Sequence, residues 1–172
     1  MSNLLPLAGF VLLSWAAAIP GIMFTPGDWY YQELKRPSWN PPSWLFGPVW
    51  SLLYTAMGVA AWLVWQEGGW SGASGLALGV FLGHLVLNAL WSYLFFGIRR
   101  PDLAMLEVVA LWLSIAVTLV LFWQVRPLAG ALFVPYLTWV SFASVLNFSI
   151  WRLNRDPDGA SGIGGVSMAD PP

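Results

Sequence analysis

The stretch Leu103–Val125, LAMLEVVALWLSIAVTLVLFWQV, decides the fold of this chain. A helix needs roughly 20 mainly apolar residues to cross a bilayer core of about 30 Å, and this stretch is long enough. Four further apolar segments of similar length lie on either side of it, at Leu4–Phe24, Ser43–Trp65, Gly75–Ile98 and Leu128–Leu153. The sequence therefore predicts an all-α integral membrane protein, a bundle of five transmembrane helices.

The composition agrees with a lipid environment and excludes several kinds of chemistry. Hydrophobic residues make up 58% of the chain, charged residues 9%, and the mean hydropathy is +0.68. An average soluble domain is about 45–50% apolar and about 25% charged. The absence of cysteine excludes thiol chemistry, disulfides and Cys-ligated metals. The net charge is −1 and the basic residues form no stripe, so nucleic acid is not an expected partner.

Two segments outside the predicted spans have their own character. Residues 25–42 contain charged residues and several prolines. This segment is too polar to lie in lipid and too rich in proline to form a continuous helix. We expect them to form a partly ordered lid over one end of the bundle, within a transmembrane domain of residues 1–154. Residues 155–172 are rich in Asp, Gly, Ser and Pro and are expected to be a disordered polar tail.

The basic residues predict the orientation. All of the 7 Lys and Arg residues except Arg126 fall on one side of the five predicted spans: Lys35, Arg36, Arg99, Arg100, Arg152 and Arg155. Because cytoplasmic segments carry an excess of Lys and Arg, the first loop, the third loop and the C-terminus are expected in the cytoplasm. The N-terminus is then expected outside.

The third predicted span carries two different faces. Gly75, Gly79 and Gly83 form a ridge of small residues that lets helix backbones approach closely in lipid. The ridge predicts either the seam of a homodimer or close packing within one bundle. On the opposite face lie the polar and aromatic side chains of His84, Asn88, Trp91 and Ser92.

Two other spans present matching inward faces. At helical spacing, side chains align on one face of each span: Trp50, Tyr54, Met57 and Ala61 on the second, and Tyr136, Trp139, Ala143 and Asn147 on the fifth. Polar atoms inside a membrane generally face protein, a ligand or a cavity. We therefore expect a shared interior lined by indoles, phenols and amides. Other tryptophans are interpreted as anchors at the membrane interface: Trp15, Trp44, Trp62, Trp65, Trp70, Trp112 and Trp123.

Conventional catalytic motifs are not found. His84 is the single histidine, and a lone imidazole beside Asn88 is more often a hydrogen-bonded interior residue than a metal ligand. No metal site and no required cofactor are predicted. Glu107 has no further acids along the spans with which to form a proton relay. The serines lack a histidine and an acid arranged for nucleophilic catalysis.

Several short runs carry a resemblance to a known family. They are Asp28-Trp29-Tyr30, Lys35 to Pro42 (KRPSWNPP), Phe46 to Tyr54 (FGPVWSLLY), Asn88 to Ser92 (NALWS), Pro135 to Trp139 (PYLTW) and Phe142-Ala143. Together they resemble the TspO/MBR family, the tryptophan-rich sensory proteins of bacteria and the mitochondrial translocator protein, or peripheral benzodiazepine receptor. The resemblance covers roughly Leu5 to Asn154 and indicates a bacterial member.

The resemblance implies a five-helix bundle, commonly dimeric, with a pocket that opens toward the first loop. Family members bind tetrapyrroles such as protoporphyrin IX, sterols and related lipids, and benzodiazepine-type drugs. Carried over by position, the pocket is expected to comprise Trp39, Pro41, Pro42, Trp50, Asn88, Trp91, Tyr136, Trp139, Ala143 and Asn147, with Tyr54, His84 and Phe142 beside them. The implied location is the bacterial cell membrane.

Three functions follow from the resemblance. The chain is expected to be a membrane receptor, sensor or carrier for porphyrins. Alternatively, it is an enzyme that degrades protoporphyrin IX in light, since the tryptophans implicated in some bacterial members correspond to Trp50 and Trp139. An excited porphyrin makes reactive oxygen and indole is easily oxidised, although photodamage of a bound dye would look similar. The third alternative is a tetrapyrrole transporter.

The sterol stretch of the animal members is altered in this chain. That pattern requires Leu or Val, then Tyr, then Lys or Arg. The run Val145–Arg152 keeps both ends but has Phe148 in the position of the tyrosine. Even the intact pattern is a weak predictor of sterol binding. Cholesterol is therefore not expected as the natural ligand.

Overall fold

The computed structural model describes residues 4–24 and 26–155, and within these ranges the chain is helical and has no strand. Its elements in order are α1 (Leu4–Ala16), α2 (Ile19–Met23), the π-helical turn η1 (Trp29–Glu33), α3 (Ser43–Gly68), α4 (Gly72–Ser92), the π-helical turn η2 (Tyr93–Gly97), α5 (Pro101–Val125) and α6 (Pro127–Asn154). Of the predicted polar tail, residues 156–172 lie outside the described residues.

The structure confirms an all-α fold of membrane-spanning helices. Helices α3, α5, α6 and the continuous segment α4–η2 are each 25 to 28 residues long and apolar enough to cross a bilayer. Helix α3 begins at Ser43, as predicted, and α5 ends at Val125, as predicted. These helices, together with the shorter apolar helix α1, make this a multi-pass integral membrane protein.

The first predicted span is not one helix. The expected helix from Leu4 to Phe24 is divided into α1 and α2 by a turn at residues 17–18. Pro20 has no N–H and cannot donate to the carbonyl of Ala16, so the helical ladder is interrupted there. The Ala17 and Ala18 amides donate to carbonyls three residues earlier, at Ser14 and Trp15. The helix therefore tightens, breaks and restarts.

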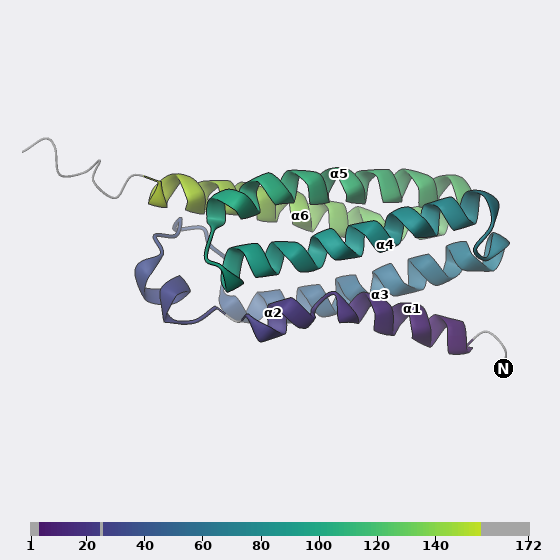
Figure 1. Cartoon of the computed structure of the whole chain (residues 1–172), viewed down its shortest axis with the longest axis horizontal. Coiled ribbons are helices and arrows are strands. Elements are labelled where there is room, and N and C mark those ends of the chain that lie inside the picture. The colour runs from purple at the N-terminus through teal and green to yellow at the C-terminus, as the bar shows by residue number, and fades with distance from the viewer. Residues whose placement is uncertain (1–3, 25, 156–172) are drawn as a thin grey trace, which may run out of the picture.

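The helices run lengthwise beside one another (Figure 1). Helix α5 packs against α4 and α6, and α1 lies along α3. The indole N–H of Trp112 donates to Ser141 Oγ at 2.8 Å and links α5 to α6. An added Cβ on Gly58 of α3 would lie 2.5 Å from the Cα of Val11, so only glycine permits this approach of α1.

The first loop, the α4–α5 connection and the C-terminal part of α6 gather at one end of the bundle (Figure 1). In the loop, Tyr30 and Leu34 are buried and pack in one cluster with Phe95, Leu146 and Ile150. The side-chain amide of Asn154 accepts from the Lys35 backbone N–H at 3.0 Å and donates to the Lys35 carbonyl at 2.9 Å. The loop is thus connected to α6 by both side-chain packing and hydrogen bonds.

The glycine ridge of α4 faces away from the bundle. Gly79 and Gly83 are exposed, and an added Cβ at either would meet nothing within 4 Å. At Gly75 the nearest atom is the carbonyl oxygen of Trp70, in the turn before α4. Among the described residues, Gly79 and Gly83 therefore do not serve close packing between helices of this chain.

Candidate ligand-binding site

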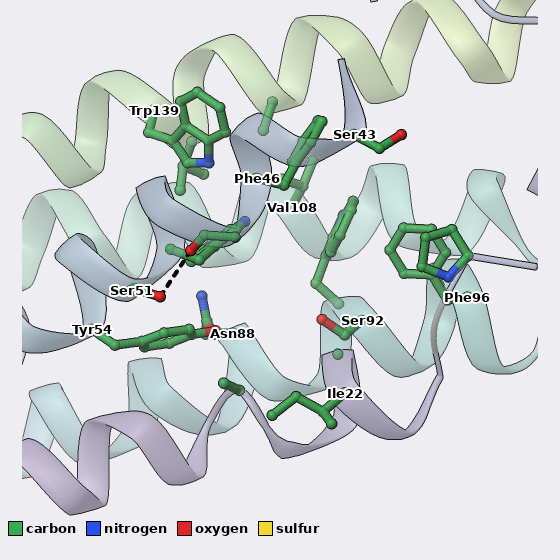
Figure 2. A pocket seen from close by; sticks show the side chains of 18 of the residues that line it. Ile22, Ser43, Phe46, Ser51, Tyr54, Asn88, Ser92, Phe96, Val108 and Trp139 are labelled. Atoms are coloured by element: carbon green, nitrogen blue, oxygen red, sulfur yellow. Dashed lines mark hydrogen bonds between the residues drawn. The ribbon is translucent and has the colours of Figure 1, made fainter. Parts of the chain in front are cut away.

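A cavity of about 360 Å³ lies between the helices next to the first loop (Figure 2). Trp139 enters it from α6, Tyr54 and Phe46 from α3, Asn88 from α4 and Ile22 from α2. Among the residues that the structure describes, the lining consists of Trp15, Ala18, Gly21, Ile22, Pro26, Tyr30, Tyr31, Ser43, Phe46, Gly47, Trp50, Ser51, Tyr54, Asn88, Trp91, Ser92, Phe96, Val108, Leu111, Trp139, Val140 and Ala143. It contains no carboxylate and no basic side chain, so the cavity suits an uncharged, apolar and aromatic body.

Asn88 joins three helices at one wall of this cavity. The Tyr54 hydroxyl of α3 donates to Asn88 Oδ1 at 2.8 Å, and Asn88 Nδ2 donates to the Tyr136 hydroxyl of α6 at 2.9 Å. Trp50 stacks on Tyr54 with ring centroids 5.3 Å apart and an interplanar angle of 27°. Because satisfied polar groups inside a bundle specify one packing arrangement, this network fixes the position of the aromatic wall.

The structure brings about half of the predicted ligand-binding residues to the cavity surface: Trp50, Tyr54, Asn88, Trp91, Trp139 and Ala143. Tyr136, His84 and Asn147 are buried but do not line it. Tyr136 lies behind Asn88, and the ring of His84 lies 5.7 Å from the ring of Tyr136. His84 Nδ1 is 2.7 Å from the Phe81 carbonyl, consistent with the predicted interior histidine.

Four further predicted residues, Trp39, Pro41, Pro42 and Phe142, also lie outside the cavity lining. Trp39 is 46% exposed and its ring meets the ring of Phe142 edge to face at 5.9 Å. Phe142 lines a separate hollow between α3 and α6, and Pro41 and Pro42 are not in contact with the cavity. The loop covers the cavity with other residues, Pro26, Tyr30 and Tyr31, and Ser43 at the start of α3 lies beside them. The turn at residues 38–39 directs the Trp39 side chain outward, which spacing alone does not reveal.

Two donors in the cavity lining have no partner among the described residues. The indole N–H groups of Trp91 and Trp139 are buried and make no hydrogen bond. An unpaired buried donor costs free energy, on the order of 1–3 kcal/mol. The two nitrogen atoms are themselves buried, so a ligand acceptor would reach them only after the indole side chains moved.

Several lining residues were not predicted for the site. Trp15 was interpreted as an interface anchor, yet it lines the cavity, and its Nε1 donates to Thr55 Oγ1 at 3.3 Å. Phe46 and Phe96 also line it. Phe46 lies one turn before Trp50 and shares its helical face, a signal that could have included it. Phe96 lies four residues after Ser92, on the face already predicted for that span, so spacing could have included it too. Trp15 lies in α1, for which no inward face was predicted.

Acidic and metal-ligating side chains are not gathered at the described part of the site. Among residues 4–24 and 26–155, no group of three or more His, Cys, Asp or Glu side chains could hold a metal ion. The phenol of Tyr30, in the first loop, donates to Asn40 Oδ1 at 3.3 Å. Burial raises the pKa of this phenol, so Tyr30 remains a neutral donor at physiological pH. The described lining therefore offers aromatic and neutral polar groups to a bound molecule.

These observations define a class: a multi-pass helical membrane protein with an uncharged aromatic cavity between its helices. The chain belongs to the TspO/MBR family, whose sequence profile matches residues 4–152. It is 40% identical to the human translocator protein over 153 residues, 87% of this chain and 90% of that protein. Protein CrtK of Rhodobacter capsulatus is 46% identical over 145 residues, 84% of this chain and 89% of that protein. The tryptophan-rich sensory protein of Cereibacter sphaeroides is 41% identical over 145 residues, again 84% and 89% of the two chains.

Proposed function

We propose that this protein is a membrane receptor, sensor or carrier that binds protoporphyrin IX and related hydrophobic ligands in the cavity beside the first loop. The observation that carries the proposal is the aromatic lining without any charged side chain. Such a surface favours flat, apolar molecules, because stacking adds to the free energy of burying apolar area. The names of relatives, a translocator protein and a sensory protein, agree with a role in ligand binding.

Light-dependent degradation of protoporphyrin IX is a second candidate. It is favoured by the position of Trp50 and Trp139, which line one cavity from α3 and α6. With dioxygen as the oxidant and light as the energy source, a porphyrin held there would lie beside two oxidisable indoles. This activity requires no metal and no conventional catalytic residue.

The assembly and orientation are also proposals. We infer a homodimer through α4, since the exposed ridge of Gly79 and Gly83 offers a surface for close packing in lipid. Gly79→Leu would then shift the molecular mass in nanodiscs from dimer to monomer, and an unchanged mass would refute this interface. We also propose a bacterial cell membrane as the location, with the C-terminus in the cytoplasm and the N-terminus outside, because the basic residues favour the cytoplasmic side. Protease access to tags at each end, in sealed vesicles of known sidedness, tests that orientation.

The first experiment is a titration of tryptophan fluorescence with protoporphyrin IX in darkness, followed by absorbance under light. Saturable quenching with a stable porphyrin spectrum would support a binding protein. Loss of porphyrin that Trp139→Phe abolishes would support the enzyme. Trp123→Phe is the matched control, because Trp123 is exposed and does not line the cavity. Absence of saturable quenching would refute porphyrin binding.

The rate at which protoporphyrin IX crosses a membrane distinguishes transport from binding. Sealed liposomes that contain the protein should move protoporphyrin IX faster than empty liposomes only if the protein is a carrier. An equal rate in both, together with saturable binding, would leave the receptor function alone.

A further inference from the structure

Arg36 occupies an unusual position at the edge of the cavity. Its guanidinium carbon lies 5.1 Å above the ring centroid of Tyr30 and 5.5 Å above that of Tyr31. Both rings line the cavity, whereas Arg36 itself does not. The aromatic rings of Tyr30 and Tyr31 therefore lie between the Arg36 cation and the apolar cavity that they line.

The guanidinium lacks an anionic partner among the described residues. The ion pairs found there join Arg100 to Asp102 and Arg126 to Glu67, and neither involves Arg36. The guanidinium donates from Nη2 to the Tyr31 carbonyl at 3.3 Å and also interacts with the neighbouring phenol of Tyr30. Since a guanidinium has five N–H donors, most of its capacity is unused. Arg36 is only half-buried, so these donors are accessible to a ligand.

The cavity and Arg36 complement one another chemically. A carboxylate inside the neutral chamber would have no cationic partner and would lose its hydration at a high cost in free energy. The same carboxylate at the edge of the chamber would meet a planar guanidinium, which binds carboxylates in a bidentate geometry. A flat apolar body in the cavity with a carboxylate at the first loop satisfies both requirements.

We propose that Arg36 is a specificity-determining residue that binds the carboxylate of an amphiphilic aromatic ligand whose apolar body fills the cavity. This inference rests on the proposed function, because it concerns the same cavity. It predicts that the protein distinguishes an aromatic acid from its neutral ester. A role of Arg36 in stabilising the first loop alone predicts no such distinction.

The test compares each acid with its ester in each variant. Protoporphyrin IX and its dimethyl ester are titrated in darkness by tryptophan quenching, in nanodiscs of phosphatidylcholine, and partition into empty nanodiscs is subtracted. The acid should bind about tenfold more tightly than the ester to the unchanged protein, the effect of one charge-assisted contact. Arg36→Gln should reduce this ratio to about one while leaving the affinity for the ester unchanged.

Controls separate recognition from stability of the loop. Arg99→Gln removes a guanidinium that lies 5.8 Å from the ring of Trp29, which does not line the cavity, and it should preserve the tenfold ratio. Arg36→Lys keeps the charge without the planar fork and should give an intermediate ratio. A ratio that Arg36→Gln leaves unchanged, or an equal loss of affinity for acid and ester, would overturn the proposal.

Two other results would also decide between the explanations. If adding phosphatidylglycerol to the nanodiscs abolishes the ratio, the guanidinium binds a lipid phosphate and the proposal fails. If neither porphyrin binds, the proposed function fails, and the same comparison is made with 1-pyrenebutyrate and its methyl ester. A preference for the pyrene acid that depends on Arg36 would support carboxylate recognition by itself, and equal binding of both would overturn it.

Discussion

Replacing Asn88 by leucine tests whether the hydrogen bonds between α3, α4 and α6 stabilise the bundle. Leucine has the same number and branching of side-chain heavy atoms as asparagine. Its larger methyl groups lie beside the cavity that Asn88 lines, so the substitution removes the amide with limited overpacking. It eliminates the bond from Tyr54 at 2.8 Å and the bond to Tyr136 at 2.9 Å. Hydrogen bonds between transmembrane helices average about 0.6 kcal/mol, with a maximum of about 1.7 kcal/mol. The expected loss in the free energy of unfolding is therefore about 1–3 kcal/mol.

The two bonds should not contribute equally. Tyr136 is 0% exposed, so water cannot replace the bond it loses. Tyr54 and Asn88 both line the cavity, where water can substitute in part. In double-mutant cycles, the coupling of Asn88→Leu with Tyr136→Phe should lie near the maximum of about 1.7 kcal/mol. The coupling with Tyr54→Phe should lie near the average of about 0.6 kcal/mol.

The assay is equilibrium unfolding in mixed micelles with increasing SDS, followed by far-ultraviolet circular dichroism. The four proteins of each cycle are compared in the same lipid and detergent. A coupling within about 0.3 kcal/mol of zero for the Asn88–Tyr136 pair, the scatter expected for independent sites, would refute the reasoning. So would a larger coupling for Tyr54 than for Tyr136.

Two further predictions concern the backbone approach of α1 to α3 and the first loop. Gly58→Ala should destabilise the protein by about 1–3 kcal/mol, because its Cβ would lie 2.5 Å from the Cα of Val11. In the same unfolding assay Gly9→Ala, at an exposed position of α1 where an added Cβ meets nothing within 4 Å, should be neutral or stabilising by up to about 1 kcal/mol. Equal effects of the two substitutions would contradict the close approach. Asn154→Ala removes both hydrogen bonds to the Lys35 backbone and should speed amide hydrogen exchange in residues 29–36 about tenfold, with global stability nearly unchanged. Gln32→Ala, which removes only an exposed hydrogen bond to Asp28, should leave that exchange unchanged, and an equal response would show that Asn154 does not hold the loop.

Much of the fold was predictable because the bilayer requires long apolar helices. Hydropathy located the segments that became α3, α5 and α6, and helical spacing brought Asn88, Trp91 and Trp139 to one interior. Hydropathy does not detect a missing backbone donor, however. Hydropathy therefore predicted one span from Leu4 to Phe24, whereas in the structure Pro20 and the turn before it divide this segment into two helices.

The sequence did not predict all of the residues that line the cavity. A tryptophan near the end of a span is equally consistent with an anchor at the interface or a contact in the interior, and Trp15 was assigned to the wrong environment. Pro41 and Pro42 were expected above the ligand, but Pro26, Tyr30 and Tyr31 of the loop line the cavity instead. Loop conformation depends on contacts distant in sequence, such as Asn154 with Lys35, which no local pattern records.

The sequence by itself determined that this chain spans a membrane as a helical bundle, and which faces of its helices are polar, because both depend on local composition and helical period. Only the tertiary structure decided which side chains share the cavity, that Gly79 and Gly83 face outward, and that Arg36 lies over Tyr30 and Tyr31. Those facts depend on the angles and registers at which helices and loop meet, and these are set by packing across the whole bundle.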